Sequence, residues 1–141
     1  MSLFPTHLFN VTDGLFGPHP IAGCFVRIFI APFDLDGVVV KTSVRLDGVD
    51  LPNSDMRALA GQTLNAPINP EAGYIDGSIY IDGAHHPVDV RQIIFGKVEH
   101  EKINASFVTE IDFTFEGLGD YQKTPWTFSA MLAWTDEAQN A

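Results

Sequence analysis

The chain has 141 residues, of which 45% are hydrophobic and 18% charged, a composition typical of a single globular domain rather than of a disordered segment. Its 18 acidic residues outnumber its 8 basic ones, which gives a formal net charge of −10. This charge disfavours binding to nucleic acids and to anionic membranes, because phosphate groups would be repelled. Cys24 is the only cysteine, so an intramolecular disulfide and a zinc–thiolate cluster are both excluded.

The N-terminal stretch does not have the pattern of a secretory signal peptide. It lacks a basic region followed by an apolar run of about 7–15 residues, as a secretory signal peptide would have. No segment of the sequence approaches the ~20 consecutive apolar residues of a membrane helix. We therefore expect a cytoplasmic location.

Residues 1–22 form an apolar arm in which Leu-Phe occurs three times, at 3–4, 8–9 and 15–16, among several prolines. Neither a helical nor a strand period fits this arm. Because its large apolar side chains would not remain in water, we expect it to pack on its own domain or on a neighbouring subunit. The second possibility would make the protein a homo-oligomer.

Two segments after the arm have strand patterns. GCFVRIFIA (23–31) is apolar on both faces except at Arg27, which indicates a strand covered on each side. VVVKTSVRL (38–46) alternates between inward apolar side chains and the outward Lys41 and Arg45. An Asp-Gly pair stands on either side of this second strand, at 36–37 and 47–48, and each pair is interpreted as a turn.

One short helix is predicted over residues 55–60. Ser54 can cap its N-terminus, and Gly61 can end it in a left-handed conformation. The stretch that follows, residues 62–73, holds two prolines and a single charge. A loop of this length inside a compact domain is often functional.

The segment YIDGSIYIDGAHHPVDV (74–90) contains Asp-Gly twice. We interpret the first pair as part of a strand over 74–81, because a turn there would leave only a very short strand before the second pair. Asp82-Gly83 lies between two strand-like runs and matches a type I′ hairpin turn, which needs positive φ at both central residues. A further strand is predicted over 91–98, with a bulge at Gly96.

The clearest strand signals lie near the C-terminus. Residues 107–116 alternate between an apolar face and an acidic face. Residues 126–135 also have a period of two, with both tryptophans on one face. A nine-residue connection, 117–125, joins them. The side chains expected to be buried together are Phe113, Phe115, Trp126, Phe128 and Trp134.

These elements predict an all-β fold of six to eight antiparallel strands with one short helix in a connection. A β-sandwich is favoured because turn signals are frequent and both inner faces are aromatic, and a partly closed barrel is the alternative. We expect residues 1–141 to form a single domain.

Two groups of residues are candidates for a functional site. Glu110, Asp112 and Glu116 would form an acidic stripe on the outer face of strand 107–116, and a cross-strand pairing of this stripe with Lys41 and Arg45 is the alternative to a binding role. Asp82, His85 and His86 could bind a metal. Neighbouring residues of a strand point to opposite faces, however, so the two histidines share one ion only if the backbone turns there. Otherwise they begin a solvated strand.

No nucleophile elbow, Gly-rich phosphate loop or dedicated metal motif occurs, so we assign no catalytic residue and no cofactor. The sequence is therefore interpreted as a non-catalytic acidic domain that binds a basic protein partner, for example an antitoxin-like or immunity-type inhibitor. Two alternatives remain open. One is a barrel that holds a small apolar ligand, and the other is a metal-assisted hydrolase that uses Asp82, His85 or His86.

Overall fold

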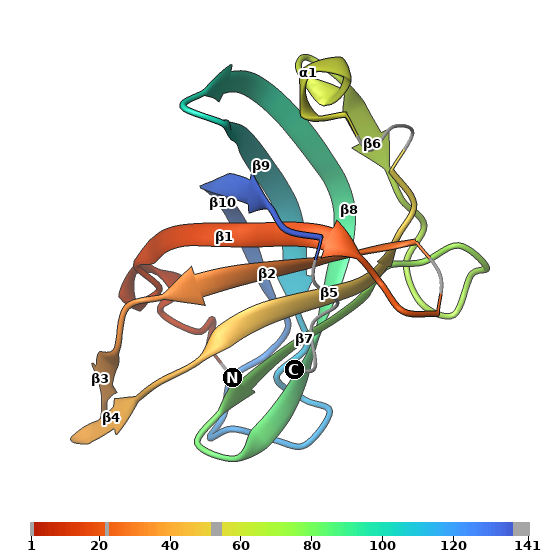
Figure 1. Cartoon of the computed structure of the whole chain (residues 1–141). Helices are drawn as coiled ribbons and strands as arrows, with labels where there is room; N and C mark the ends of the chain where they lie inside the picture. The colour runs from red at the N-terminus through yellow and green to blue at the C-terminus, as the bar shows by residue number, and fades with distance from the viewer. Residues whose placement is uncertain (1, 22, 52–54, 137–141) are drawn as a thin grey trace.

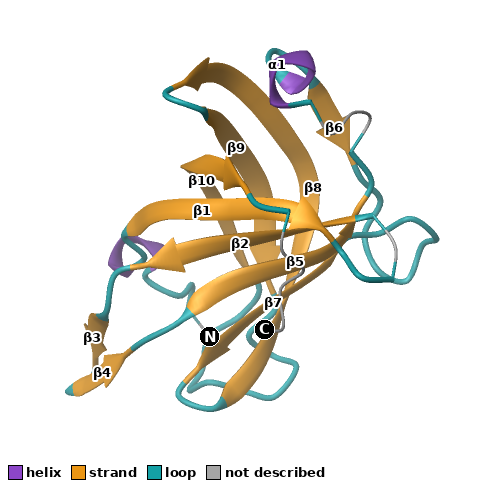
Figure 2. Cartoon of the chain, in the orientation of Figure 1, coloured by secondary structure: helices purple, strands orange, loops and turns teal. Residues whose placement is uncertain are grey.

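A computed structural model describes residues 2–21, 23–51 and 55–136. Strands dominate this part of the chain, together with one 3-10 helix, η1, and one short α-helix (Figures 1 and 2). The elements in chain order are η1 (Thr6–Leu8), β1 (Val11–Pro18), β2 (Cys24–Ile30), β3 (Phe33–Leu35), β4 (Val38–Val40), β5 (Ser43–Val49), α1 (Met56–Leu59), β6 (Thr63–Asn65), β7 (Asp76–Ile81), β8 (Ala84–Glu99), β9 (Lys102–Ile111) and β10 (Thr124–Trp134).

Seven of the strands close into a barrel, in the ring order β8-β7-β5-β2-β1-β10-β9, with β9 pairing back to β8. β6 adds an eighth strand outside the ring by pairing with β8, and β3 and β4 form a separate hairpin. The all-β prediction is confirmed, and of its two arrangements the barrel is the one that forms. Closure removes the unpaired edges that an open sheet would expose.

One pair of neighbouring strands in the ring, β1 and β10, is parallel, and this corrects the expectation of an entirely antiparallel sheet. The physical reason is the odd number of strands. Directions that alternate around a ring return to their starting sense only when the number of strands is even, so seven strands leave one parallel pair. This parallel pair joins β1, the first strand of the ring in sequence, to β10, the last.

The apolar arm contains β1, although no strand period fits its sequence. The alternation is hidden by a bulge between Val11 and Gly14 and by glycines at sites where the neighbouring strands approach closely. At Gly17, for example, an added Cβ would lie 2.1 Å from the carbonyl oxygen of Thr135. Phe4, Phe9 and Phe16 from this segment are buried among other aromatic side chains of the same chain.

The interpretation of the two Asp-Gly pairs in 74–90 is confirmed. Asp76-Gly77 lies within β7, and Asp82-Gly83 forms the β7–β8 turn, with φ of 50° at Asp82 and 82° at Gly83. Asp36-Gly37 is also a turn, between β3 and β4. Asp47-Gly48 is not, because both residues lie inside β5, where Gly48 has φ of 71° beside a register shift in the β2–β5 pairing.

The predicted strand over 38–46 is two strands, β4 and β5, because the chain leaves the β3–β4 hairpin at Lys41 and enters the barrel at Ser43. Val38 is consequently exposed rather than buried. The helix forms as predicted, but its N-cap is Asp55, whose carboxylate accepts a hydrogen bond from the Arg57 nitrogen at 3.0 Å. Ser54, the expected cap, lies outside the described residues.

β8 is the longest strand, and in Figure 1 it runs the full height of the barrel. A register shift between Phe95 and Val98 coincides with the bulge predicted at Gly96. Residues 62–73, expected as a loop, contribute β6 to the edge of β8. β6 pairs with residues 92–94 of β8, beyond the residues 84–88 that pair with β7.

The C-terminal pair forms as predicted over most of its length, but β9 ends at Ile111 rather than at residue 116. The chain turns over residues 113–117, and the backbone nitrogen of Asp112 donates to the carbonyl of Pro87. Phe113 still points inward, whereas Phe115 is 62% exposed, so its predicted burial is wrong. Trp126 and Phe128 are buried as expected, and Trp134 is half-buried.

Candidate functional site

Residues from both candidate groups meet at one end of the barrel, where the β7–β8 hairpin lies beside the turn that follows β9. Hydrogen bonds and ring contacts join the two strands of the hairpin to each other and to this turn, which is far from them in sequence. We call this cluster the hairpin site. Its members are Ser78, Tyr80, His85, Phe115 and Glu116.

His85 is the centre of the hairpin site. Its Nε2 lies 2.8 Å from the Ser78 hydroxyl oxygen, and its backbone nitrogen donates to Glu116 Oε2 at 2.7 Å. The imidazole stacks on Tyr80 with ring centroids 4.9 Å apart, and it meets Phe115 edge-on at 5.6 Å. These four contacts hold the histidine in one orientation on the outer surface of the barrel.

The Ser78–His85 pair has the spacing of a nucleophile and its general base. A catalytic triad also needs a third group that orients the ring of the base. Glu116 contacts the backbone nitrogen of His85 and not the ring. We therefore interpret the contact between Ser78 and His85 as one that fixes the imidazole, and we assign it no catalytic role.

Two large side chains of the hairpin site are more than half exposed, Tyr80 at 57% and Phe115 at 62%. Both lie against the ring of His85, one on its face and one at its edge. The backbone fixes Tyr80 further, because its carbonyl accepts a hydrogen bond of 2.5 Å from the Thr42 hydroxyl. The result is a platform of three rings at the surface.

His86 points in the opposite direction, as strand geometry requires. It is fully buried, pairs with Ile79 across the β7–β8 ladder, and has its ring 5.0 Å from that of Phe113. Neither ring nitrogen has a hydrogen-bond partner among the described residues. Burial lowers the pKa of His86, and His85 lowers it further, against the opposing effects of Glu116 and Asp112. The interpretation of both histidines as a solvated strand start is wrong for His86.

The three residues of the acidic stripe lie on different elements. Glu110 is on β9, Asp112 follows the end of that strand, and Glu116 is in the turn. Asp112 accepts hydrogen bonds from the backbone nitrogen and the hydroxyl of Thr114, so it shapes the turn that carries Phe115. Glu116 belongs both to the acidic stripe and to the hairpin site, so the two are continuous.

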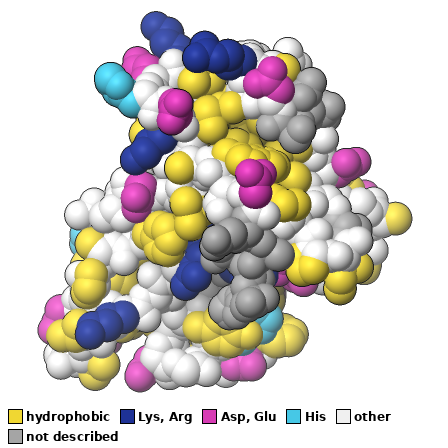
Figure 3. Space-filling model, in the orientation of Figure 1, with side chains coloured by type: hydrophobic (Ala, Val, Ile, Leu, Met, Phe, Trp, Pro, Cys, Tyr) yellow, Lys and Arg dark blue, Asp and Glu magenta, His cyan; other side chains and the backbone are white. Residues whose placement is uncertain are grey.

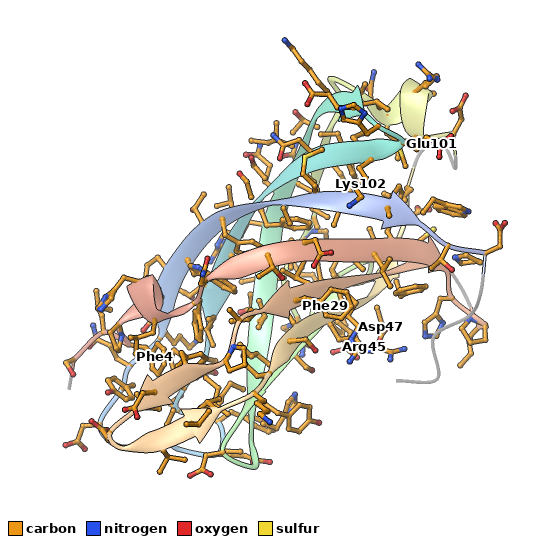
Figure 4. All side chains as sticks on the ribbon, turned by 60° about the vertical axis from the view of Figure 1, so that its left-hand side comes forward. Phe4, Phe29, Arg45, Asp47, Glu101 and Lys102 are labelled. Carbon is orange, nitrogen blue, oxygen red and sulfur yellow. The ribbon has the colours of Figure 1, made fainter. Side chains whose placement is uncertain are left out.

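Asp89 extends the acidic surface, because it lies directly opposite Glu110 in the β8–β9 ladder. Two carboxylates in this position repel each other. Burial raises the pKa of Asp89, and Glu110 and Asp112 raise it further, against the lowering effects of Lys123 and Arg91. The pairing with Lys41 and Arg45 is not formed in the barrel, since β5 is bordered by β2 and β7, and Arg45 instead contacts Asp47 at 3.2 Å (Figure 4).

The candidate metal ligands Asp82, His85 and His86 do not converge. Asp82 is exposed at the hairpin turn, His85 is on the outer surface, and His86 is inside the barrel. Over residues 2–21, 23–51 and 55–136, no group of three or more histidine, cysteine, aspartate or glutamate side chains has the arrangement of a metal site.

The barrel interior bears on the apolar-ligand alternative. Aromatic side chains from the N-terminal segment, β9, β10 and the turn after β9 stack on one another inside it. Phe4 lies between Phe9 and Phe113, with centroids at 5.0 and 4.7 Å, at the end of the barrel near the N-terminus (Figure 4). These rings occupy space that a ligand in this part of the barrel would need.

Ser78, Tyr80 and Phe115 of the hairpin site, and Asp89 of the acidic surface, are not among the site residues predicted from the sequence. Asp89 and Tyr80 could have been found, because continuing the alternation through the hairpin places both on the outer face. Phe115 could not, because its exposure depends on the turn that ends β9.

Comparisons with known proteins give no further assignment: no family model, no curated protein and no solved structure matches the chain. Within the described part of the chain, no helix combines the length and the apolar character needed to span a membrane.

Proposed function

We propose that this protein is a non-catalytic acidic interaction domain that binds a basic protein partner, with an antitoxin-like or immunity-type inhibitor as one concrete version. The observation that carries the proposal is the hairpin site, where the exposed Tyr80 and Phe115 flank a fixed His85 beside the carboxylate of Glu116. Exposed rings next to charged groups are what a protein interface uses, since aromatic anchors supply affinity and the charged rim supplies specificity.

The acidic residues around the platform support a basic partner rather than a neutral one. Glu116 lies in the same turn as Phe115, Asp112 immediately precedes this turn, and Glu110 with Asp89 continues the negative surface along β9 and β8. The net charge of −10 adds a long-range field of the same sign. Such a field speeds association with a positively charged surface and disfavours nucleic acids and anionic membranes. We propose that the domain acts in the cytoplasm.

Site-specific photo-crosslinking tests where the partner binds. A photoreactive phenylalanine analogue replaces Tyr80 in one variant and Ile94 in a control variant. Ile94 is 40% exposed and stands further along β8, nine residues beyond His85, or roughly 30 Å at the rise of a strand. We expect a basic protein to be crosslinked from the native source at position 80 only. Crosslinking that is equal at both positions, or that captures acidic proteins, contradicts the proposal.

Association kinetics with the captured partner test the role of charge. The variant Glu110→Gln, Asp112→Asn, Glu116→Gln removes three charges but keeps an oxygen acceptor at each position. Its association rate should be at least several-fold lower than that of the native protein at low salt, and the difference should shrink as salt screens charges beyond ~8 Å. The dissociation rate should change less. An association rate that is independent of both salt and these three charges contradicts the proposal.

Metal analysis separates this proposal from the hydrolase alternative. Protein purified without a histidine tag is assayed for zinc and manganese, together with a His85→Ala variant. Stoichiometric metal that is lost in the variant would replace the interaction-domain proposal with the metal site.

A further inference from the structure

We infer that the three-ring platform of Tyr80, His85 and Phe115 binds one arginine side chain of the partner. The guanidinium group of this arginine stacks on the rings and pairs with Glu116. This inference rests on the proposed function, because it names the group by which a basic partner would be recognised at the hairpin site. It is narrower than that proposal, since a basic partner could also be held by its overall charge.

The platform is fixed before any partner arrives. His85 is held by the hydroxyl of Ser78 on β7 and, through its backbone, by Glu116. The backbone carbonyl of Tyr80 accepts from the Thr42 hydroxyl, and its ring stacks on that of His85. Asp112 shapes the turn that presents Phe115 to the edge of the imidazole. Groups that are already ordered lose little conformational freedom on binding, so the contact favours a specific ligand.

The exposed surfaces of the two outer rings contribute no hydrophobic stabilisation to the fold. Phe115 and Tyr80 each leave more than half of their surface in water, and they do so at neighbouring positions on different segments. Other phenylalanines of the described chain, such as Phe16, Phe25, Phe107 and Phe113, are fully buried. The face shown in Figure 3 carries apolar side chains interspersed with charges of both signs, so exposed apolar atoms alone would not mark a site. The site is marked instead by the fixed geometry of the three rings and by the adjacent carboxylate of Glu116.

The chemistry of the platform selects a guanidinium group over an ammonium group. Arginine is planar, stacks on aromatic faces and offers several N–H donors to a carboxylate in the same plane. Glu116 is exposed and uses Oε2 for the His85 backbone nitrogen, so its carboxylate is already directed at the platform. Lysine would gain the charge interaction with Glu116 but not the planar stacking.

The experiment compares three short peptides that are identical except for a central arginine, lysine or citrulline, each flanked by glycine, serine and two lysines. Their affinities for the full chain are measured by NMR titration at low salt. The native protein should bind the arginine peptide about two- to fivefold more tightly than the lysine peptide. The citrulline peptide should bind more weakly than both, and the ring resonances of Phe115 and His85 should shift with arginine.

Two variants and a matched control complete the test. Phe115→Ser and Tyr80→Ser each remove an exposed ring and should bring the arginine-to-lysine ratio close to one, while Ile94→Ser should leave it unchanged. Thermal unfolding shows whether each variant is folded, and Tyr80→Ser gives the answer if Phe115→Ser is not. An arginine-to-lysine affinity ratio of one in the native protein, or an unchanged ratio in both ring variants, overturns the inference of an arginine site. Neither result contradicts the basic-partner proposal, which the crosslinking experiment tests separately because it uses no peptide.

Discussion

At the scale of single residues, His86 is a buried imidazole without a hydrogen-bond partner among the described residues. A buried polar group in this state costs roughly 1–3 kcal/mol of desolvation. Its lowered pKa means that the unfolded chain binds the proton more readily than the folded chain. The neutral form is therefore the one compatible with the barrel.

This leads to a prediction for the pH dependence of stability. The free energy of unfolding should decrease as the pH falls below about 6.5, the ordinary pKa of histidine, because His86 then favours the unfolded state. His86→Leu should remove this part of the dependence and should stabilise the protein most at low pH. Urea unfolding between pH 5 and 8 measures it, with the exposed His7→Gln as the control. A variant that keeps the native slope would contradict the assignment to His86.

The two glycines of the Asp-Gly pairs should respond differently to substitution. At Gly83 there is open space but φ is 82°, so Gly83→Ala should cost only about 1–2 kcal/mol of backbone strain. At Gly77 an added Cβ would lie 2.3 Å from the Val88 carbonyl oxygen, so the β7–β8 pairing must shift. We expect Gly77→Ala to destabilise the barrel more than Gly83→Ala, as measured by chemical unfolding. A larger destabilisation by Gly83→Ala than by Gly77→Ala would indicate that the tight turn lies at Asp76-Gly77.

At the scale of elements, the end of β9 separates two phenylalanines that alternation alone puts on one face. Phe113 is fully buried against Phe4 and His86, whereas Phe115 is mostly exposed. Phe113→Ala should lower the free energy of unfolding by about 3–5 kcal/mol, and Phe115→Ala by less than about 0.5 kcal/mol. Equal losses for the two variants in urea unfolding would show that β9 continues to residue 116.

At the scale of the whole molecule, closure depends on β1. This strand pairs with β2 on one side and with β10 on the other, so deleting residues 2–18 opens the ring and leaves two unpaired edges. The same deletion removes the buried Phe4, Phe9 and Phe16. We expect the truncated chain to dimerise or aggregate through its open edges, as measured by light scattering after gel filtration.

A synthetic peptide of residues 2–18 should restore a monomeric complex with the truncated chain. A truncated chain that remains monomeric, with native circular dichroism, would show that the arm is dispensable for closure.

The sequence by itself determined the class of fold and the local conformations that depend on neighbouring residues. The alternation in 107–111 and 126–134 specified buried faces, since side chains of a strand point alternately to its two sides. The choice between the Asp-Gly pairs at 76–77 and 82–83 followed from the strand length on either side. The acidic surface was also visible, because charge is a property of composition.

Only the tertiary structure decided which segments meet. The parallel β1–β10 pair follows from closing an odd number of strands, which no local pattern contains. The hairpin site depends on the turn after β9 lying beside the β7–β8 hairpin, more than thirty residues earlier in the chain. The turn after β9 places Phe115 at the surface and brings Glu116 to the His85 backbone, because closure of the barrel fixes the positions of the turn and the hairpin relative to each other.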